Sequence, residues 1–226
     1  MKKMSAKVTV AILAASAVLS ACGGSGSSET TAAAAGGDTS AAETTAAVAD
    51  ANATYKDTLN IAVVQQAPSL DLHKNSSLIA RQIMDGTVFE KLVTQNSKAE
   101  AVPELCESYD VSDDATTITF HLRKGVKFHD GSEMTADDVV ASMNRWIDGF
   151  SSAKSTVGDA RFEKVDDYTV KIAADHSIIL LPQMIAGAAQ PAAITTAAAC
   201  EKEDSNGFLE EYIGTGPYKF TEWVQD

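Results

Sequence analysis

Basic side chains that could bind a metal ion or an anion gather in the middle of the chain: His121, Arg123, Lys127 and His129. If this segment is an extended strand, His121 and Arg123 share the face opposite Phe120, which is normally solvated. No Cys, His or carboxylate at zinc-type spacing accompanies them. The sequence therefore predicts no metal site and no cofactor here.

A second candidate for chemistry is the tetrapeptide Ser151-Ser152-Ala153-Lys154, which satisfies S-x-x-K, the nucleophile motif of penicillin-binding enzymes. The companion motifs S-D-N and K-T-G are missing, and a four-residue pattern often arises by chance. The chain contains neither H-E-x-x-H nor G-x-S-x-G. An extracellular hydrolase built around Ser151 and Lys154 stays an alternative, but the sequence favours a protein that is not an enzyme.

Two short strands are expected around these basic side chains. Apolar and polar residues alternate over residues 118–123, the period-two pattern of a half-buried strand. After a turn at Gly125, Val126 and Phe128 resume the alternation until Gly131 turns the chain again.

An amphipathic helix should follow these strands. Thr135 suits its N-cap, because the hydroxyl can accept an orphan amide hydrogen bond and Asp138 lies three residues on, as in a capping box. Spacing successive residues by 100° places the apolar side chains on one stripe of roughly 120°. That stripe contains Val139, Val140, Met143, Trp146, Ile147 and Phe150.

The rest of residues 55–226 predicts a mixture of strands and helices. We expect a strand over 58–64, a hairpin of 162–165 with 168–172, short helices over 178–184 and 192–201, a turn at 214–217 and a strand over 218–223. We also expect a helix over 77–93, whose buried side would comprise Leu78, Ile79, Ile83, Gly86, Phe89 and Val93.

Residues 118–145 closely resemble the motif of the family 5 extracellular solute-binding proteins of ABC transporters, which include dipeptide, oligopeptide, nickel and glutathione binders. The similarity extends through separate motifs in the same order: SLDLHKNSS (69–77), VFEKLV (88–93), VPELCESYDVSDDATT (102–117) and GTGPYKFTEW (214–223). Several separated motifs in the right order make the resemblance specific.

The resemblance implies a mixed α/β fold of the type II periplasmic-binding-protein class, in which two lobes enclose a solute. The roughly 170 residues of the segment 55–226 can support one substantial core. Members of the family are longer than this chain. We therefore expect an N-terminal fragment that covers most of lobe one and lacks the second lobe.

The resemblance also points to ligand-binding residues. The segment 69–77 matches the part of the family where peptide binders present backbone groups to the ligand, so Asn75, Ser76 and Ser77 are candidates. Ser76 or Ser77 could equally cap the following helix, and the two roles are compatible. Phe150 occupies a position where family members often place an aromatic residue at the cleft, although it also belongs to the apolar stripe and could be a core residue.

The N-terminus has the features of an export signal. Lysines at positions 2, 3 and 7 precede an apolar run over 8–19, which is shorter than the about twenty residues of a membrane span. The following Leu19-Ser20-Ala21-Cys22 resembles a lipobox, so we expect removal of residues 1–21 and lipidation of Cys22. Cleavage of an ordinary secretory signal near Ala21 is the alternative. The Ala/Thr/Ser/Gly-rich residues 22–54 should form a disordered tether.

Charge and cysteine content restrict the partners. The formal net charge of −13 becomes more negative once the N-terminal lysines are removed, and such a surface repels nucleic acid. Besides Cys22 the chain has Cys106 and Cys200, which show no disulfide spacing signature and lie in mildly apolar settings. Outside the cytoplasm the pair could form a disulfide, but free buried thiols are the favoured interpretation.

The sequence therefore predicts a monomeric, lipid-anchored receptor on the extracytoplasmic face of the cell membrane. It would capture an oligopeptide or a similar small solute and deliver it to ABC permease subunits. An acidic tether behind a lipobox favours a Gram-positive envelope; in a Gram-negative cell the receptor would face the periplasm. A surface lipoprotein that uses the same fold for sensing or adhesion is the alternative.

Overall fold

The structure is a computed structural model and describes residues 60–224. The expected signal peptide (1–21), the lipidation site Cys22, the tether to residue 54 and the first residues of the expected strand 58–64 lie outside this range.

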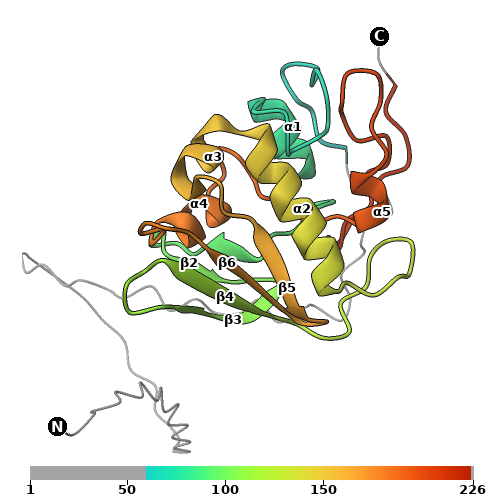
Figure 1. Cartoon of the computed structure of the whole chain (residues 1–226). Helices are drawn as coiled ribbons and strands as arrows, with labels where there is room; N and C mark the ends of the chain where they lie inside the picture. Colours follow the sequence, from blue (N-terminus) through green and yellow to red (C-terminus); the bar gives the residue numbers. More distant parts are fainter. Residues whose placement is uncertain (1–59, 225–226) are drawn as a thin grey trace, which may run out of the picture. The chain divides into compact units, whose positions relative to one another are not determined.

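A four-stranded antiparallel sheet with strand order β3-β4-β6-β5 forms the centre of the described chain (Figure 1). Its strands are β3 (Cys106–Val111), β4 (Thr117–Leu122), β5 (Phe162–Asp166) and β6 (Thr169–Ala173). Along β4 the buried side chains Ile118, Phe120 and Leu122 alternate with partly exposed ones. Phe120 pairs with Tyr109 on one side and Val170 on the other. The expected strand over 118–123 and the expected hairpin of 162–172 are confirmed.

Helix α2 (Ala136–Gly149) packs along the sheet (Figure 1). It begins with the expected capping box, in which the Thr135 amide donates to the Asp138 carboxylate at 2.9 Å. Of the expected apolar stripe, only Val140 is partly exposed, and the other five side chains are buried. The helix was predictable because its cap and its apolar period are both local in sequence.

Apolar side chains form two clusters. The larger lies between the sheet, α2, α3 (Ser151–Val157) and α4 (Leu181–Ala186), and its biggest side chains include Trp146, Phe120 and Phe162. The smaller surrounds α1 (Leu78–Met84), with Leu70, Leu72, Ile79, Ala80, Met84, Val88 and Phe89. A two-stranded hairpin, β1 (Val93–Gln95) with β2 (Ala101–Pro103), completes the sheet structure.

The expected helix over 77–93 is wrong in its length. Helix α1 ends at Met84, because Asp85 is extended and Gly86 has a φ of 72°, a left-handed conformation that glycine adopts readily. Leu78 is 58% exposed and Gly86 is exposed, so these two are not on a buried side. Phe89 and Val93 are buried, but beyond the helix.

Three expected strands do not form in the described residues. Residues 60–64 have no strand partner there, and Ile61 and Val64 are 74% and 92% exposed. The segment 126–128 makes only the isolated bridge of Lys127 with Glu133, because the chain turns back at once. Residues 218–223 form no strand either; the Tyr218 amide donates to the Thr87 carbonyl at 3.0 Å. A strand needs a continuous partner for its backbone groups, and alternation alone does not supply one.

The two short helices after the hairpin are shorter than expected. Helix α4 begins at Leu181, where Pro182 suits the first turn. Helix α5 (Ala197–Cys200) begins only after Thr196, whose hydroxyl accepts the Ala199 amide at 3.1 Å. Within residues 60–224, no helix is long and apolar enough to cross a membrane.

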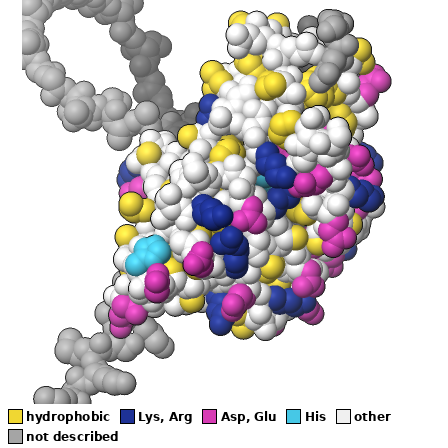
Figure 2. Space-filling view, turned by 45° about the horizontal axis from the view of Figure 1, so that its top comes forward, with side chains coloured by type: hydrophobic (Ala, Val, Ile, Leu, Met, Phe, Trp, Pro, Cys, Tyr) yellow, Lys and Arg dark blue, Asp and Glu magenta, His cyan; other side chains and the backbone are white. Residues whose placement is uncertain are grey.

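Charged side chains of both signs intermix on the surface shown in Figure 2, with hydrophobic side chains scattered between them. Many of these charges form exposed pairs, such as Lys202 with Glu211 at 2.8 Å and Arg161 with Asp148 at 2.9 Å. Such pairs contribute little to stability, about 0–1 kcal/mol each. The pair of Asp71 with Arg145 differs from these, because both of its side chains are buried.

Candidate functional site

The 69–77 loop, which precedes α1, is closed by its own hydrogen bonds. The Asn75 side chain donates to the Ser69 carbonyl and accepts from the Ser77 amide at 2.8 Å. The Asp71 carboxylate accepts the His73 amide at 2.8 Å, and the Ser69 hydroxyl accepts the Asp71 amide at 3.2 Å. These bonds give the segment a defined conformation without regular secondary structure.

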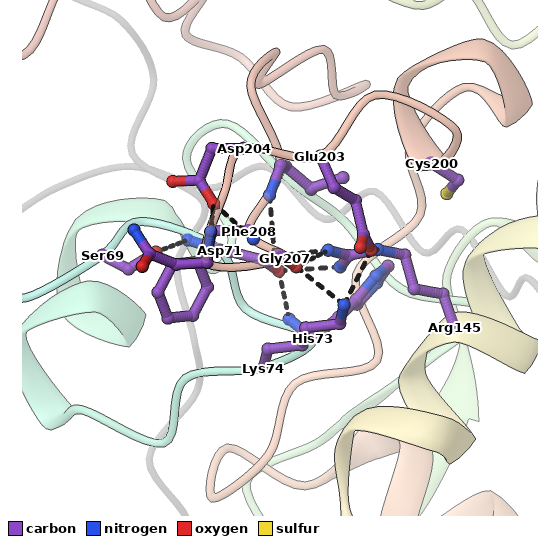
Figure 3. Close-up of polar contacts among 12 residues, drawn as sticks. Ser69, Asp71, His73, Lys74, Arg145, Cys200, Glu203, Asp204, Gly207 and Phe208 are labelled. Atoms are coloured by element: carbon purple, nitrogen blue, oxygen red, sulfur yellow. Dashed lines mark hydrogen bonds and ion pairs between the residues drawn. The ribbon is translucent and has the colours of Figure 1, made fainter.

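A buried ion pair fixes the middle of this loop to α2. Both terminal nitrogens of the Arg145 guanidinium donate to the Asp71 carboxylate, at 3.0 and 2.7 Å (Figure 3). The Asp71 side chain is 0% exposed and the Arg145 side chain 7%. The Asp71 carboxylate also accepts a hydrogen bond from the Leu209 amide at 3.0 Å. A fork-shaped pair with its other bonding positions filled is the geometry in which buried charges are tolerated.

A second carboxylate, Glu203, links this pair to the loop at another point. The Nε of Arg145 donates to Glu203 at 2.9 Å, and the Nζ of Lys74 donates to the same carboxylate at 2.7 Å (Figure 3). Lys74 and Arg145 also both donate to the Gly207 carbonyl, at 2.7 and 3.1 Å. We call Asp71, Lys74, Arg145 and Glu203 the charge network.

The pKa values of Asp71, Arg145 and Glu203 are shifted in the directions that favour their charged forms. Burial acts to raise the pKa of Asp71, but the hydrogen bonds and charge of Arg145 outweigh it, so that the pKa lies below its usual value. Burial likewise opposes the charge of Arg145, yet its bonds to Asp71 raise its pKa. The hydrogen bond from Lys74 lowers the pKa of Glu203. Asp71, Arg145 and Glu203 are therefore charged near neutral pH.

His73 lies fully buried next to the charge network. Burial lowers the pKa of His73 to about 4, so the imidazole is neutral at neutral pH. Its Nε2 lies 2.6 Å from the Ala193 carbonyl and donates to it in the neutral form. Gly149, the last residue of α2, packs so closely on the His73 carbonyl that a Cβ there would collide with it. The end of α2 is thus pressed against the 69–77 loop.

The residues expected to bind ligand are placed as follows. Asn75 and Ser77 are half-buried and take part in the loop's own bonds, and Ser76 is exposed. Ser77 occupies the N-cap position of α1 but makes no side-chain capping bond. Phe150 is 7% exposed and packs edge-on against Trp146 at 6.5 Å between ring centroids, as a core side chain does. Phe150 directly follows Gly149, the residue of α2 that packs on the His73 carbonyl of the loop.

A surface hollow of about 290 Å³ is lined in part by Tyr212 and Phe220, and residues 69–77 are not among its lining. The phenol of Tyr212 lies against Ser69 and Leu70, and burial raises its pKa. The rings of Tyr212 and Phe220 meet edge-on, with centroids 4.9 Å apart. The volume of the hollow lies just below the range for ligand pockets, roughly 300–1,000 Å³.

The basic side chains that could have formed a metal or anion site serve other purposes. His121 pairs with Asp110 at 2.9 Å on the partly exposed face of β4. The Nε2 of His129 donates to the Gly216 carbonyl at 2.8 Å, and its Nδ1 accepts the Gly214 amide at 3.3 Å, so both ring nitrogens hold the turn at 214–216. Among residues 60–224, no group of His, Cys, Asp and Glu could hold a metal ion.

The alternative hydrolase residues and the cysteines lie as follows. Ser151 and Lys154 belong to the short helix α3 and both line an open surface hollow. Cys106 and Cys200 are free, as expected, and burial raises the pKa of each thiol to about 11. Such thiols are poor nucleophiles at neutral pH.

Sequence reasoning missed the charge network altogether. Arg145 could have been noticed, because a basic residue lies next to the apolar stripe of α2 and would need a carboxylate there. No sequence signal identifies Asp71 and Glu203 as its partners, since they lie 74 and 58 residues away.

The protein-family model described as "Bacterial extracellular solute-binding proteins, family 5 Middle" matches residues 100–226, more than half of the chain. Among curated proteins, Di/tripeptide-binding protein 1 of Pseudomonas aeruginosa is 32% identical over 163 residues, which is 62% of this chain and 30% of that protein. Glutathione-binding protein GsiB of Escherichia coli is 30% identical over 184 residues, 80% of this chain and 35% of that protein.

Solved structures are similar over the same region. NikZ from Campylobacter jejuni in complex with Ni(L-His) has a TM-score of 0.62 and 27% identity, covering 76% of this chain and 34% of that one. The binding protein AgaA from A. tumefaciens, in complex with agropinic acid, has a TM-score of 0.60 and 31% identity, covering 71% and 32%. The chain spans about a third of the length of the relatives it matches.

Proposed function

Because the chain belongs to family 5 of the bacterial extracellular solute-binding proteins, we propose that it binds a small solute outside the cytoplasm for an ABC importer. The membership confirms the resemblance seen in the sequence, and the mixed α/β, periplasmic-binding-protein-like fold is confirmed with it. Relatives named as binding proteins support a protein that is not an enzyme.

The observation that carries the proposal is a polar loop that is closed by its own hydrogen bonds and contacts one wall of a hollow through Tyr212. The charge network and the loop's own bonds hold residues 69–77 in one conformation, and Ser76 stays exposed there. A preorganised polar edge lowers the entropy cost of binding a flexible solute. Tyr212 and Phe220 add an aromatic wall that would accept an apolar side chain of the solute.

The solute class that we propose is an oligopeptide or a similar small molecule. The names of two relatives, one for di- and tripeptides and one for glutathione, support this class. Asn75, Ser76 and Ser77 are the proposed contact residues, with Phe150 supporting them from the end of α2. In this role the backbone groups of 75–77 would pair with the main chain of a peptide.

The remaining features belong to the same proposal. Lipidation at Cys22 would anchor a monomer to the extracytoplasmic face of the cell membrane, in a Gram-positive envelope, where it would deliver solute to the ABC permease. The proposal of an anchor has a direct test, because Cys22→Ala should release the protein from membranes. Continued membrane attachment of that variant would contradict lipidation.

Solute binding can be tested by titrating the isotope-labelled chain with a tripeptide, with glutathione and with nickel chloride, while following backbone amides by NMR. We expect the two peptides to shift the amides of residues 75–77. The affinity of these 226 residues should be weak, on the order of millimolar, because they span only about a third of the length of relatives named for peptide binding. Shifts caused by nickel alone, or peptide shifts confined to other parts of the chain, would contradict the proposal.

A further inference from the structure

We propose that Glu203 is a positioning residue for the 69–77 loop: by bridging Lys74 and Arg145, it sets where Asn75, Ser76 and Ser77 stand. The inference rests on the proposed function only in treating these three residues as the solute edge. In the structure Glu203 forms its hydrogen bonds with Lys74 and Arg145 and none with residues 75–77, so it would act through others.

The first step is the bridge itself. One carboxylate oxygen of Glu203 accepts from Lys74 at 2.7 Å and from Arg145 at 2.9 Å (Figure 3). Lys74 belongs to the loop, and Arg145 belongs to α2, which packs on the sheet. A single side chain therefore connects the loop to the rigid body of the protein, in addition to the link through Asp71.

The second step concerns charge. The charge network contains two carboxylates and two cations, and each cation contacts a carboxylate. Without the charge of Glu203, Asp71 would be the only carboxylate of the charge network, and Lys74 forms no ion pair with Asp71 in the structure. Lys74 would lose its ion pair while keeping its bond to the Gly207 carbonyl, and its ammonium would gain by turning to water.

The third step is that Glu203 itself is held firmly. The turn after it is closed by the Asp204 carboxylate, which accepts the amides of Asn206 at 2.8 Å and Phe208 at 3.0 Å. Glu203 also forms an isolated bridge with Leu209, whose amide donates to Asp71. The segment 203–209 is therefore a fixed support rather than a flexible flap, even though Glu203 is 34% exposed.

The fourth step is transmission along the loop. Lys74 is the chain neighbour of Asn75, whose side chain closes the loop on the Ser69 carbonyl and the Ser77 amide. Movement of Lys74 would strain both of these bonds. The amide of Ser77 is thus a local reporter of the position of the edge, and the amide of His73, bonded to Asp71, reports the inner half of the loop.

The test compares Glu203→Gln with Glu211→Gln by amide hydrogen exchange in the intact chain. Glu211 is a matched control, because it pairs with Lys202 at 2.8 Å in the same segment but outside the charge network. We expect Glu203→Gln to speed exchange at Ser77 by about tenfold, with unchanged exchange at Phe120 and Val170 in the sheet. Glu211→Gln should change none of these rates.

Lys74→Met provides a second variant. It should speed exchange at Ser77 as Glu203→Gln does, and the double variant should be no faster than either single one, because both remove the same bridge. Unchanged exchange at Ser77 in Glu203→Gln would overturn the positioning role. An equal rise at Ser77, Phe120 and Val170 would also overturn it, since it would indicate a general loss of stability.

Failure of this inference can be told apart from failure of the proposed function, because the exchange rates are measured without solute. A tripeptide titration of the same variants adds the functional readout. We expect Glu203→Gln to weaken peptide binding at residues 75–77 by about tenfold. The control for binding is Glu163→Gln, which removes an exposed pair with Lys171 at 3.5 Å away from the hollow and should leave binding unchanged. Faster exchange without any peptide shift in the parent chain would support positioning and contradict peptide binding.

Discussion

The body made of the sheet and α2 is held together differently from the region around the 69–77 loop. In the body, Phe120, Trp146 and Phe162 are fully buried in one apolar cluster. Around the loop, four charges from three separate segments meet. The apolar cluster of this region is the smaller of the two. Apolar packing tolerates small shifts, whereas a buried fork of hydrogen bonds requires one geometry. The hydrogen-bonded fork of Arg145 with Asp71, which requires the most specific geometry, therefore lies in the same loop region as the proposed contact residues 75–77.

The largest expected effect breaks the loop region alone. Arg145→Met leaves the Asp71 carboxylate buried without its partner, which should lower the free energy of unfolding by about 3–5 kcal/mol. The matched control is Arg161→Met, which removes the exposed pair with Asp148 and a bond to the Ala160 carbonyl and should cost about 0–1 kcal/mol. Urea unfolding of both variants measures the contrast. Equal losses would mean that the buried network is no more important than a surface pair.

The second effect uses pH. Because burial lowers the pKa of His73 from 6.5 to about 4, the unfolded chain takes up a proton in this window that the folded chain does not. The free energy of unfolding should therefore fall by roughly 3 kcal/mol as the pH drops from about 6.5 to about 4. His73→Gln should flatten this slope, and His176→Gln, at an exposed site, should not. Parallel slopes in urea unfolding at several pH values would contradict the burial argument.

The third effect tests the body. Phe120→Leu should lower the free energy of unfolding by about 1–2 kcal/mol, because it removes packing at a fully buried position between β3 and β6. Phe220→Leu, in the partly buried layer of the smaller cluster, should cost less. Thermal unfolding of both variants gives the comparison. A larger loss for Phe220→Leu would reverse the ranking of the two apolar clusters.

The smallest effect concerns the start of α2. Thr135→Ala removes the capping side chain of α2, the helix of the body that also carries Arg145, and should cost about 1 kcal/mol. The exposed Thr221 offers a control, since Thr221→Ala should change stability very little. Urea unfolding distinguishes the two. A neutral Thr135→Ala would show that packing alone sets the start of the helix.

Features that depend on neighbouring residues could be predicted. The alternation at Ile118, Phe120 and Leu122 and the capping box of Thr135 with Asp138 are encoded within a few residues, and both were found as expected. The helix over 77–93 was predicted too long, because an apolar period continues past Gly86 although the backbone does not. The ligand-binding roles of Asn75, Ser76, Ser77 and Phe150 stay predictions.

The sequence by itself determined the family, the central helix and most of the sheet, because their signals are short-range patterns and ordered motifs. Only the tertiary structure decided that Asp71, Lys74, Arg145 and Glu203 form one network. A charged residue carries no mark of its partner, and the pairs here join positions 58 to 129 residues apart. Which charges meet depends on how the loop, α2 and the segment 203–209 pack together, and that is a property of the folded chain.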